Sequence, residues 1–173
     1  MRRVAAREPG AFEHLIGLYQ PRLRRLAFRL TGWQSEIDDL IQEVFLAAFE
    51  KAGQFRGHAS LWTWLTVITL NKSRTATRRR VLRERITTAL PWFKPHPKHL
   101  NADIDSGESA AQVRSAVASL RPQDRELIVL HYLEGNTPAE IARFLAISPN
   151  TVEVRLHRAR KRLREVLHDY MKE

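Results

Sequence analysis

The sequence contains no cysteine among its 173 residues, which excludes a disulfide framework and any thiolate metal site. It has no apolar run that approaches the roughly 18 residues of a membrane-spanning helix. The first residues, MRRVAAREPGAFEHL, lack the apolar core of a secretory signal. We therefore expect a cytoplasmic protein with no direct membrane insertion.

Catalytic signatures are also missing. The chain has no hydrolase elbow, no phosphate-binding loop, no paired-histidine zinc motif and no internal repeat. His96 and His99 are close in sequence, but neither a cysteine nor an acid at ligand spacing accompanies them. We expect no metal, no cofactor and no enzymatic activity.

The charge balance points to a polyanionic partner. Lysine and arginine number 29 against 19 aspartates and glutamates, a formal net charge of +10. A hydrophobic content of 43% is sufficient for a core, and the length allows one ordinary domain or two small ones.

Residues 120–167 predict three helices, of which the last two form a helix-turn-helix. The first, from about Pro122 to Leu133, carries apolar side chains at Leu127, Ile128, Leu130 and Leu133. Gly135-Asn136 ends it, because both residues tolerate the left-handed backbone of a helix end.

The second helix has a clear start. Thr137 can cap it, Pro138 suits its first position, and Glu140 completes a capping box. One face of this helix holds Ile141, Ala142 and Leu145. Ser148-Pro149 then repeats the cap-and-proline signal and opens the last helix.

The last helix has one apolar and one polar face. The apolar stripe recurs every three or four residues: Val152, Leu156, Ala159, Leu163 and Val166. The polar face is rich in bases: Asn150, Glu153, Arg155, His157, Arg158, Lys161 and Arg162. The alternative is a solvated amphipathic helix, but the repeated cap signal at helix-turn-helix spacing favours insertion into a DNA major groove. Arginines there can bond phosphates or guanine.

Two helices are predicted before residue 52. The first, Gly10 to Thr31, has a kink or break at Pro21 and ends at Gly32. Ser35 is expected to cap the second, with Glu36, Asp38 and Asp39 in its first turn. Its buried stripe is Ile37, Leu40, Ile41, Val44, Phe45, Ala48 and Phe49, and the residues outside it are Asp38, Asp39, Gln42, Glu43 and Glu50. This acidic face is either a protein-docking surface or a means of balancing charge.

An irregular loop, residues 53–60, precedes a third helix that Ser60 caps and that runs to about Arg80. Its core-facing residues are Leu61, Trp64, Leu65 and Ile68, and its basic end contains Lys72, Arg74, Arg78, Arg79 and Arg80. Aromatic residues, an amide and cations together can hold single-stranded nucleic acid, although a helix dipole also favours basic residues at this end. The proline-bearing and acidic stretch 86–108 reads as a linker.

The order of these motifs resembles the extracytoplasmic-function (group IV) branch of the bacterial sigma factors, the promoter-specificity subunits of RNA polymerase. The resemblance covers nearly the whole chain and is weakest over 86–108. AFEHLIGLYQPRLRRLA resembles the family's first helix, and DDLIQEVFLAAF resembles the helix that binds the coiled coil of the polymerase's largest subunit. FRGHASLWTWLTVITLNKSRTATRRR resembles the region that opens and reads the −10 element. LRPQDRELIVLHYLEGNTPAEIARFLAISPNTVEVRLHRARKRL resembles the module that reads the −35 element.

The resemblance implies a role for each matching residue. Core polymerase would be bound by Asp38, Asp39, Gln42 and Glu43. The −10 DNA, including a flipped base, would be bound by Phe55, Arg56, His58, Ser60, Trp62, Asn71, Arg74, Arg78 and Arg79. The −35 DNA would be bound by Asn150, Thr151, Glu153, Arg155, Arg158, Lys161 and Arg162.

Three positions depart from the family pattern. Glu153 stands where a basic residue is usual, and a glutamate can accept a hydrogen bond from cytosine N4. Ala146 stands where glycine is usual, and a left-handed backbone there would cost about 1 kcal/mol. Thr75 replaces a frequent acid, with no consequence that the sequence reveals.

We therefore expect an all-α protein of two small helical domains, 1–85 and 109–173, joined by a flexible linker, 86–108. Its partners would be bacterial core RNA polymerase, promoter DNA and a membrane-linked or soluble anti-sigma factor. The alternative is a stand-alone dimeric helix-turn-helix regulator, for which the acidic helix has no evident use.

Overall fold

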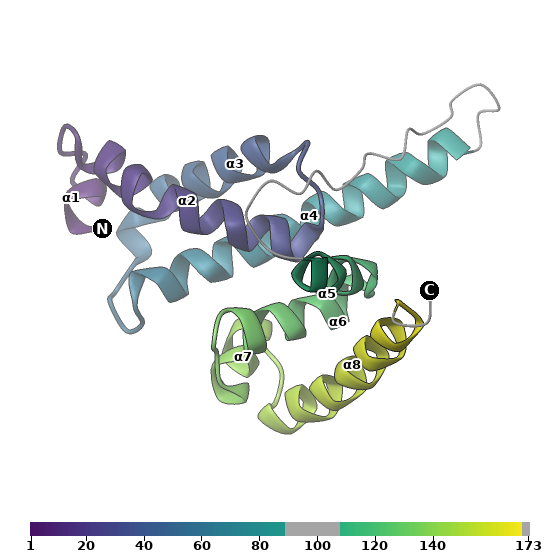
Figure 1. The fold of residues 1–173 in the computed structure, drawn as a ribbon. Coiled ribbons are helices and arrows are strands. Elements are labelled where there is room, and N and C mark those ends of the chain that lie inside the picture. The colour runs from purple at the N-terminus through teal and green to yellow at the C-terminus, as the bar shows by residue number, and fades with distance from the viewer. Residues whose placement is uncertain (89–107, 171–173) are drawn as a thin grey trace. The chain divides into compact units, whose positions relative to one another are not determined.

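The computed structural model describes residues 1–88 and 108–170. Every element in these ranges is helical, and the chain divides into two compact units, Met1–Leu100 and Asn101–Glu173 (Figure 1). The predicted all-α fold of two small helical domains is confirmed. A flexible linker was predicted over residues 86–108. Residues 89–107 of this range lie outside the described residues. At its two ends, residues 86–88 and Glu108 are helical instead.

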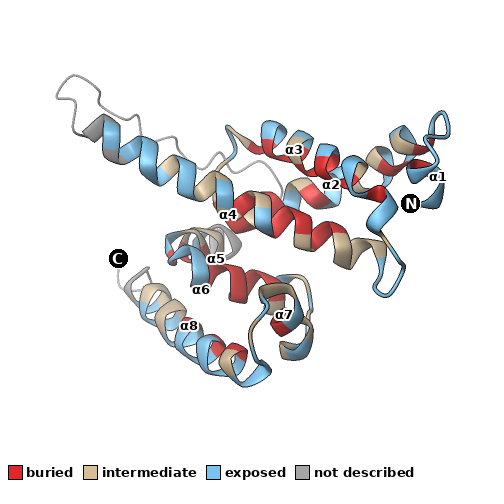
Figure 2. Cartoon of the chain, turned by 180° about the vertical axis from the view of Figure 1, so that it is seen from behind, coloured by how far each residue is buried: buried red, intermediate tan, exposed pale blue. Residues whose placement is uncertain are grey.

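The N-terminal unit is built on three long helices: α2 (Ala11–Thr31), α3 (Ile37–Glu50) and α4 (Leu61–Thr88). Each of them packs against the other two, and their facing sides hold the buried residues (Figure 2). The core cluster comprises Leu23, Ala27, Ile37, Leu40, Ile41, Val44, Phe45, Ala47, Ala48, Leu65 and Ile68. The apolar stripe predicted for α3 is therefore its buried face.

Two short elements that the sequence analysis did not predict complete this unit. They are α1 (Arg2–Ala5) and a 3-10 turn, η1 (Ala52–Gln54), and they contact each other. A second small cluster, Val4, Ala11, Leu15 and Ala52, is buried where they meet α2.

Glycines and backbone bonds set the ends of α2 and α3. Gly10 and Gly32 are both left-handed, with φ of 74° and 76°, so α2 ends at Gly32 as predicted. Pro21 lies inside α2, and the predicted break is wrong because the helix continues through it. The predicted cap by Ser35 is also wrong, since α3 begins at Ile37 after Glu36 and no side chain caps it. The Ile37 N–H donates instead to the Gln34 carbonyl at 3.3 Å.

Helix α4 starts as predicted but ends later. The Ser60 hydroxyl accepts from the Thr63 N–H at 3.0 Å, which is the expected cap. The helix continues past its predicted end at Arg80 to Thr88. An ion pair of 2.8 Å joins Arg80 to Glu84 one turn along, and the Arg80 guanidinium also lies 4.5 Å from the centre of the Trp33 ring. These contacts stabilise turns for which the apolar periodicity gives no signal.

The C-terminal unit consists of α5 (Glu108–Ser119), α6 (Pro122–Ile128), α7 (Pro138–Leu145) and α8 (Pro149–Tyr170), with a π-helical turn, η2 (Val129–Leu133), after α6. Helix α8 packs against α5, α6 and α7. Its buried residues Val152, Leu156 and Ala159 belong to the predicted apolar stripe, and Leu163 and Val166 are half-buried.

The π-helical turn corrects the predicted single helix from Pro122 to Leu133. The Glu134 N–H donates to the Val129 carbonyl at 3.0 Å, five residues back, which widens the turn. Leu133, expected to share the buried face of Leu127 and Leu130, is 43% exposed as a result. The backbone and side-chain amides of Asn136 then both donate to the Leu130 carbonyl, at 3.0 and 2.9 Å.

The predicted caps of the helix-turn-helix are confirmed. Thr137 Oγ1 accepts from the Glu140 N–H at 3.3 Å, and Glu140 Oε2 accepts from the Thr137 N–H at 2.8 Å. Ser148 Oγ accepts from the Thr151 N–H at 3.2 Å. Between the two helices Ala146 is left-handed, with φ 53° and ψ 46°. This is the left-handed backbone in which an alanine is expected to cost about 1 kcal/mol relative to glycine.

A buried arginine holds α5 to α6. The Arg125 side chain donates to the carbonyls of Val117 at 3.2 Å and Leu120 at 3.0 Å, and also to that of Ala118. These bonds satisfy carbonyls that the end of α5 leaves open. Burial lowers the pKa of the Arg125 guanidinium, and the three carbonyls offset the loss of its hydration.

Candidate protein and nucleic-acid interfaces

The acidic face of α3 lies away from its buried stripe, and the four residues predicted to bind polymerase, Asp38, Asp39, Gln42 and Glu43, occupy its first two turns. Asp38, Asp39 and Gln42 are exposed, and Glu43 is half-buried. Asp38 forms an ion pair with Arg24 of α2. Asp39 forms no ion pair with any other described residue, so its carboxylate is available to a partner.

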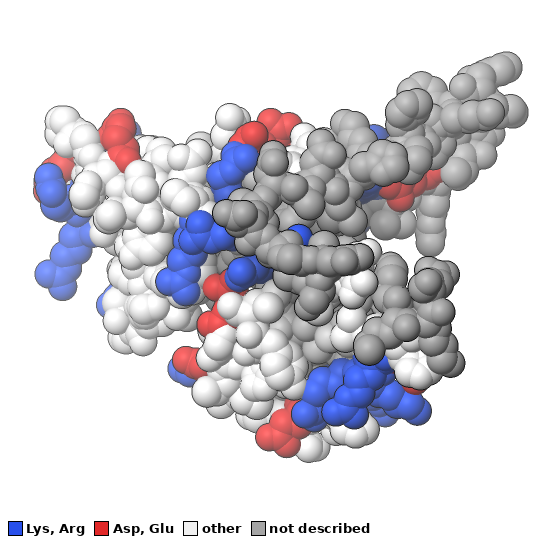
Figure 3. Space-filling model, in the orientation of Figure 1, with Lys and Arg blue, Asp and Glu red and all other residues white. Residues whose placement is uncertain are grey.

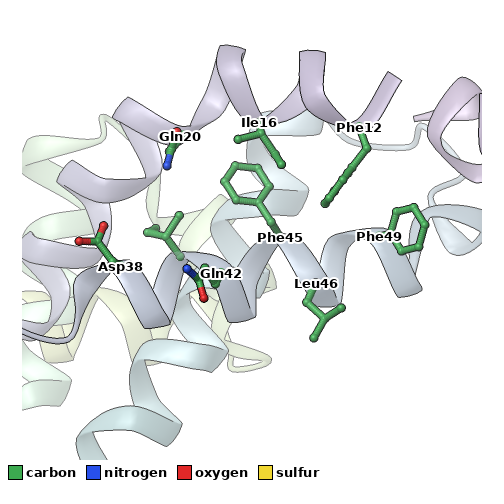
Figure 4. A pocket seen from close by; sticks show the side chains of 9 residues that line it. Phe12, Ile16, Gln20, Asp38, Gln42, Phe45, Leu46 and Phe49 are labelled. Carbon is green, nitrogen blue, oxygen red and sulfur yellow. The ribbon is translucent and has the colours of Figure 1, made fainter. Parts of the chain in front are cut away.

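A groove of about 450 Å³ borders this face. Its lining comes from α2 (Phe12, Ile16, Gln20) and α3 (Asp38, Ile41, Gln42, Phe45, Leu46, Phe49). Figure 4 shows Phe12 and Ile16 opposite Phe45, with Leu46 pointing away from α2. Leu46 is 58% exposed at the edge of this groove. An apolar groove with an acidic edge suits a partner helix that presents apolar and basic side chains.

Glu43 differs from its neighbours because both of its oxygens already have cationic partners. Its Oε2 lies 3.1 Å from Lys72 Nζ, and its Oε1 lies 3.2 Å from Arg79 Nη1. Both cations belong to α4. The structure therefore links one of the predicted polymerase contacts to the helix predicted to bind DNA.

The predicted −10 site begins in the loop before α4. Phe55 is half-buried, with its ring 5.4 Å from that of Trp64 in an edge-on contact. Trp62 is stacked on Tyr19 at 6.5 Å, and the Arg22 guanidinium lies 3.7 Å from the Trp62 ring centre.

The polar residues of the same loop are more accessible than Phe55 and Trp62. Arg56 and His58 are exposed, and Ser60 is occupied as the helix cap. In this conformation the loop thus presents polar groups to solvent, while Phe55 and Trp62 pack against the unit itself.

The cations of α4 fall on two faces. Asn71, Arg74 and Arg78 follow one another at spacings of three and four and share a face, on which Asn71 and Arg78 are exposed. Lys72 and Arg79, seven residues apart, share another face and contact Glu43. Of the predicted −10 set, Arg79 thus lies with Lys72, on a different face of α4 from Asn71, Arg74 and Arg78.

Helix α8 carries the predicted −35 site. Asn150, Glu153, Arg155, Arg158 and Lys161 are all exposed. Figure 3 shows lysine and arginine side chains gathered along α8.

Two predicted −35 residues are engaged within the C-terminal unit. The hydroxyl of Thr151, a half-buried residue, lies 2.7 Å from that of Ser148, and Arg162 forms an ion pair with Asp124 of α6. The Asp124 side chain is only 11% exposed. Arg162 therefore fills a structural role in this conformation.

Among the described residues, no helix combines the length and apolarity needed to cross a membrane. No group of three or more histidines, aspartates and glutamates in these ranges could hold a metal ion. His96 and His99 lie outside the described residues.

Comparisons with known proteins agree with these two units. The family described as "Sigma-70 region 2" matches residues 15–83, and that described as "Sigma-70, region 4" matches residues 110–163. The ECF RNA polymerase sigma factor SigM of Mycobacterium tuberculosis is 33% identical over 165 residues, which cover 91% of this chain and 77% of SigM. The chain belongs to the ECF RNA polymerase sigma factors.

Other relatives of this sigma factor support the same assignment. SigE of Mycolicibacterium smegmatis, also named an ECF RNA polymerase sigma factor, is 32% identical, and the match covers 94% of this chain and 64% of SigE. The solved structure of the sigma factor RpoE of Bartonella quintana, in complex with the anti-sigma factor NepR, has a TM-score of 0.74 and 25% identity, covering 92% of this chain and 98% of RpoE. Of the two sequence-based interpretations, these relatives favour the sigma factor over the stand-alone regulator.

Two residues of this sigma factor were missed as candidates. Lys72 was predicted to be basic surface, without its contact to Glu43, because the contact joins residues far apart in sequence. Val154 is 44% exposed on α8, opposite the buried stripe. Its spacing from Asn150 and His157, four and three residues, could have identified it.

Proposed function

We propose that this sigma factor binds core RNA polymerase through the acidic face of α3 and the adjoining groove. The observation that carries the proposal is the exposed carboxylate of Asp39, which pairs with no cation among the described residues, beside an apolar groove that has the 58% exposed Leu46 at its edge. Acidic and apolar groups together complement a polymerase helix with basic and apolar side chains. The chain would act as a transcription initiation factor, not as an enzyme, in the cytoplasm.

The N-terminal unit is proposed to read and open the −10 element. Arg56 and His58 in the loop, and Asn71 and Arg78 on α4, are exposed and polar. Extruding a base costs a few kcal/mol, which contacts to the displaced strand must offset. Phe55 and Trp62 would take part if the base displaced their present neighbours.

The C-terminal unit is proposed to read the −35 element through α8. Asn150, Glu153 and Val154 lie near the start of that helix, where side chains reach base edges in a major groove. Arg155, Arg158 and Lys161 supply charge for phosphates. The exposed charges and the helix-turn-helix caps support this assignment.

An anti-sigma factor is proposed as the regulatory partner. The support comes from the RpoE relative, whose solved structure is a complex with the anti-sigma factor NepR. The partner could be membrane-anchored or soluble.

The polymerase contact is tested by charge reversal on α3. Asp39→Lys should weaken binding to core RNA polymerase at least about 10-fold, measured by fluorescence anisotropy of labelled protein. Glu50→Lys is the matched control, because Glu50 is exposed at the far end of the same helix, about three turns from Asp39, and does not line the groove. Circular dichroism should show unchanged helicity in both. If Asp39→Lys binds core polymerase as tightly as Glu50→Lys, the acidic face is only solvated and the proposal fails.

A further inference from the structure

Lys72 and Arg79 of α4 hold a carboxylate between them. Glu43 Oε2 lies 3.1 Å from Lys72 Nζ, and Glu43 Oε1 lies 3.2 Å from Arg79 Nη1. Each oxygen thus accepts from a different cation, and the carboxylate comes from the neighbouring helix α3. The side chains of Glu43 and Lys72 are 40% and 33% exposed, so the cluster lies at the surface.

This arrangement has the chemistry of a phosphate site. Lys72 and Arg79 are seven residues apart, which places them two turns apart on one face of α4. Here an ammonium and a guanidinium bind separate oxygens of the same anion. Ammonium and guanidinium groups also bind the phosphates of the DNA backbone. A carboxylate and a phosphate compete for the same donors, because both are anions with hydrogen-bond-accepting oxygens.

We propose that Lys72 and Arg79 form a binding site for a phosphate of promoter DNA, and that the Glu43 carboxylate occupies this site in the free protein. The proposal rests on the proposed function in one respect, that α4 faces DNA. DNA must displace Glu43 before it gains both cations. Glu43 therefore lowers the DNA affinity of the free chain.

The other face of α4 provides the contrast. Arg78 is exposed and forms no ion pair with another described residue. A phosphate can bind Arg78 without displacing an internal anion. The energetic effect of Glu43 should thus be specific to Lys72 and Arg79.

Glu43 also belongs to the acidic face proposed to bind polymerase. A polymerase cation that attracted Glu43 would release Lys72 and Arg79 for DNA. By thermodynamic linkage, DNA binding at these cations would then strengthen polymerase binding by the same factor. Glu43 would couple the two partners within one small unit.

The test uses the full-length free protein and a short fluorescein-labelled single-stranded DNA oligonucleotide. Glu43→Gln, which keeps the shape and removes the charge, should bind the oligonucleotide about 3- to 10-fold more tightly than the wild type. The slope of log K against log salt should steepen by about 0.7 for each cation that gains a phosphate. Glu50→Gln removes the same charge from the same helix and should change affinity much less.

A double-mutant cycle identifies the cations. Arg79→Gln should reduce DNA affinity more in the Glu43→Gln background than in the wild type, whereas Arg78→Gln should reduce it equally in both. Thermal unfolding of each variant confirms that it is folded. If Arg79→Gln is not folded, Lys72→Met takes its place in the cycle.

Two results would overturn the proposal, and they differ. If Arg78→Gln weakens binding while Glu43→Gln behaves like Glu50→Gln, then α4 binds DNA but Glu43 does not compete for it. If neither Arg78→Gln nor the Arg79→Gln variant in the Glu43→Gln background weakens binding, then the proposed DNA role of α4 fails, and this inference fails with it.

Discussion

Ala146 shows how one residue can carry a strained backbone at the centre of a recognition motif. It terminates α7 with φ 53° and ψ 46°, a conformation in which the Cβ of an L-residue crowds the following carbonyl. Its N–H donates back to the Ala142 carbonyl, so the left-handed turn satisfies the helix end. The helix-turn-helix geometry therefore forms despite the alanine.

Ala146→Gly should stabilise the C-terminal unit by about 1 kcal/mol, because glycine adopts the left-handed conformation without strain. Urea unfolding followed by circular dichroism measures the change. Ala139→Gly, at an exposed position in the first turn of α7, is the control and should destabilise by less than about 1 kcal/mol. A loss of stability in Ala146→Gly comparable to that of Ala139→Gly would show that the turn carries no strain.

Glu140 makes the stability of the same unit depend on pH. The pKa of its carboxyl is lowered, first by the hydrogen bond from the Thr137 backbone N–H and then by that from the Thr137 hydroxyl. Because the folded pKa lies below the unfolded one, the ionised capping box stabilises the fold fully above the ordinary glutamate value of about 4.3. The contribution is lost as the pH falls through the folded pKa.

The wild type should accordingly be more stable than Glu140→Gln by a constant amount near neutral pH, and the difference should shrink in acid. Thermal unfolding at a series of pH values gives this difference directly. A difference that stays the same from neutral pH to well below 4 would contradict an ionised capping box.

At the scale of elements, α8 is proposed to separate residues that read bases from residues that hold phosphates. Glu153 and Val154 lie in its first turns, whereas Lys161 lies two turns further along. A glutamate accepts from cytosine N4, and an aliphatic side chain contacts the methyl group of thymine. Cations that contact only phosphates carry no sequence information.

Glu153→Ala and Val154→Ala should each change the base preference at one position of the −35 element. The difference in binding free energy between bases there should change by about 1–3 kcal/mol. Lys161→Ala should weaken binding to all −35 sequences alike and reduce the salt dependence. Selection from a randomised −35 library with the holoenzyme distinguishes these outcomes. If Glu153→Ala shows a uniform loss with no altered preference, Glu153 serves the helix dipole alone.

Arg162 and its neighbour Lys161 should behave differently, although the sequence places both on the basic face. Arg162 pairs with Asp124, whose side chain is 11% exposed, and removing it leaves a nearly buried carboxylate without its partner. Arg162→Ala should therefore lower the free energy of unfolding by about 1–3 kcal/mol. Lys161→Ala should leave it within about 0.5 kcal/mol.

Urea unfolding of these two variants, alongside DNA binding, separates structural from binding effects. Equal stabilities of the Arg162 and Lys161 variants would contradict the structural role of the Arg162–Asp124 pair.

Local signals predicted most elements of the fold, and long-range contacts account for the errors. Caps at Ser60, Thr137 and Ser148 depend on neighbouring residues, so the sequence reveals them. The extension of α4 depends partly on the contact of Arg80 with Trp33, and the role of Arg162 depends on Asp124, both distant in sequence. The π-helical turn was not predicted because Leu127, Leu130 and Leu133 have the spacing of a regular helix. The acidic face could be read from α3 alone, whereas the engagement of Glu43 by α4 could not.

At the scale of the whole molecule, promoter recognition is proposed to be divided between two units on one chain. Each unit presents a small basic surface, on α4 in one and on α8 in the other. Two weak contacts reinforce each other only when a partner fixes their spacing, because the second contact then forms at a high effective concentration. The free protein should thus bind duplex promoter DNA weakly, and the polymerase should supply the missing geometry.

The most direct measurement is open-complex formation on a matched promoter, followed by permanganate reactivity of the −10 thymines and by run-off transcription. The protein with core RNA polymerase should make these thymines reactive and yield a specific transcript, while the protein alone and core alone should do neither. Asp39→Lys should abolish both signals under conditions where Glu50→Lys retains them. The account would be contradicted if the free protein bound the promoter tightly and specifically at physiological salt while the mixture with core polymerase gave no open complex.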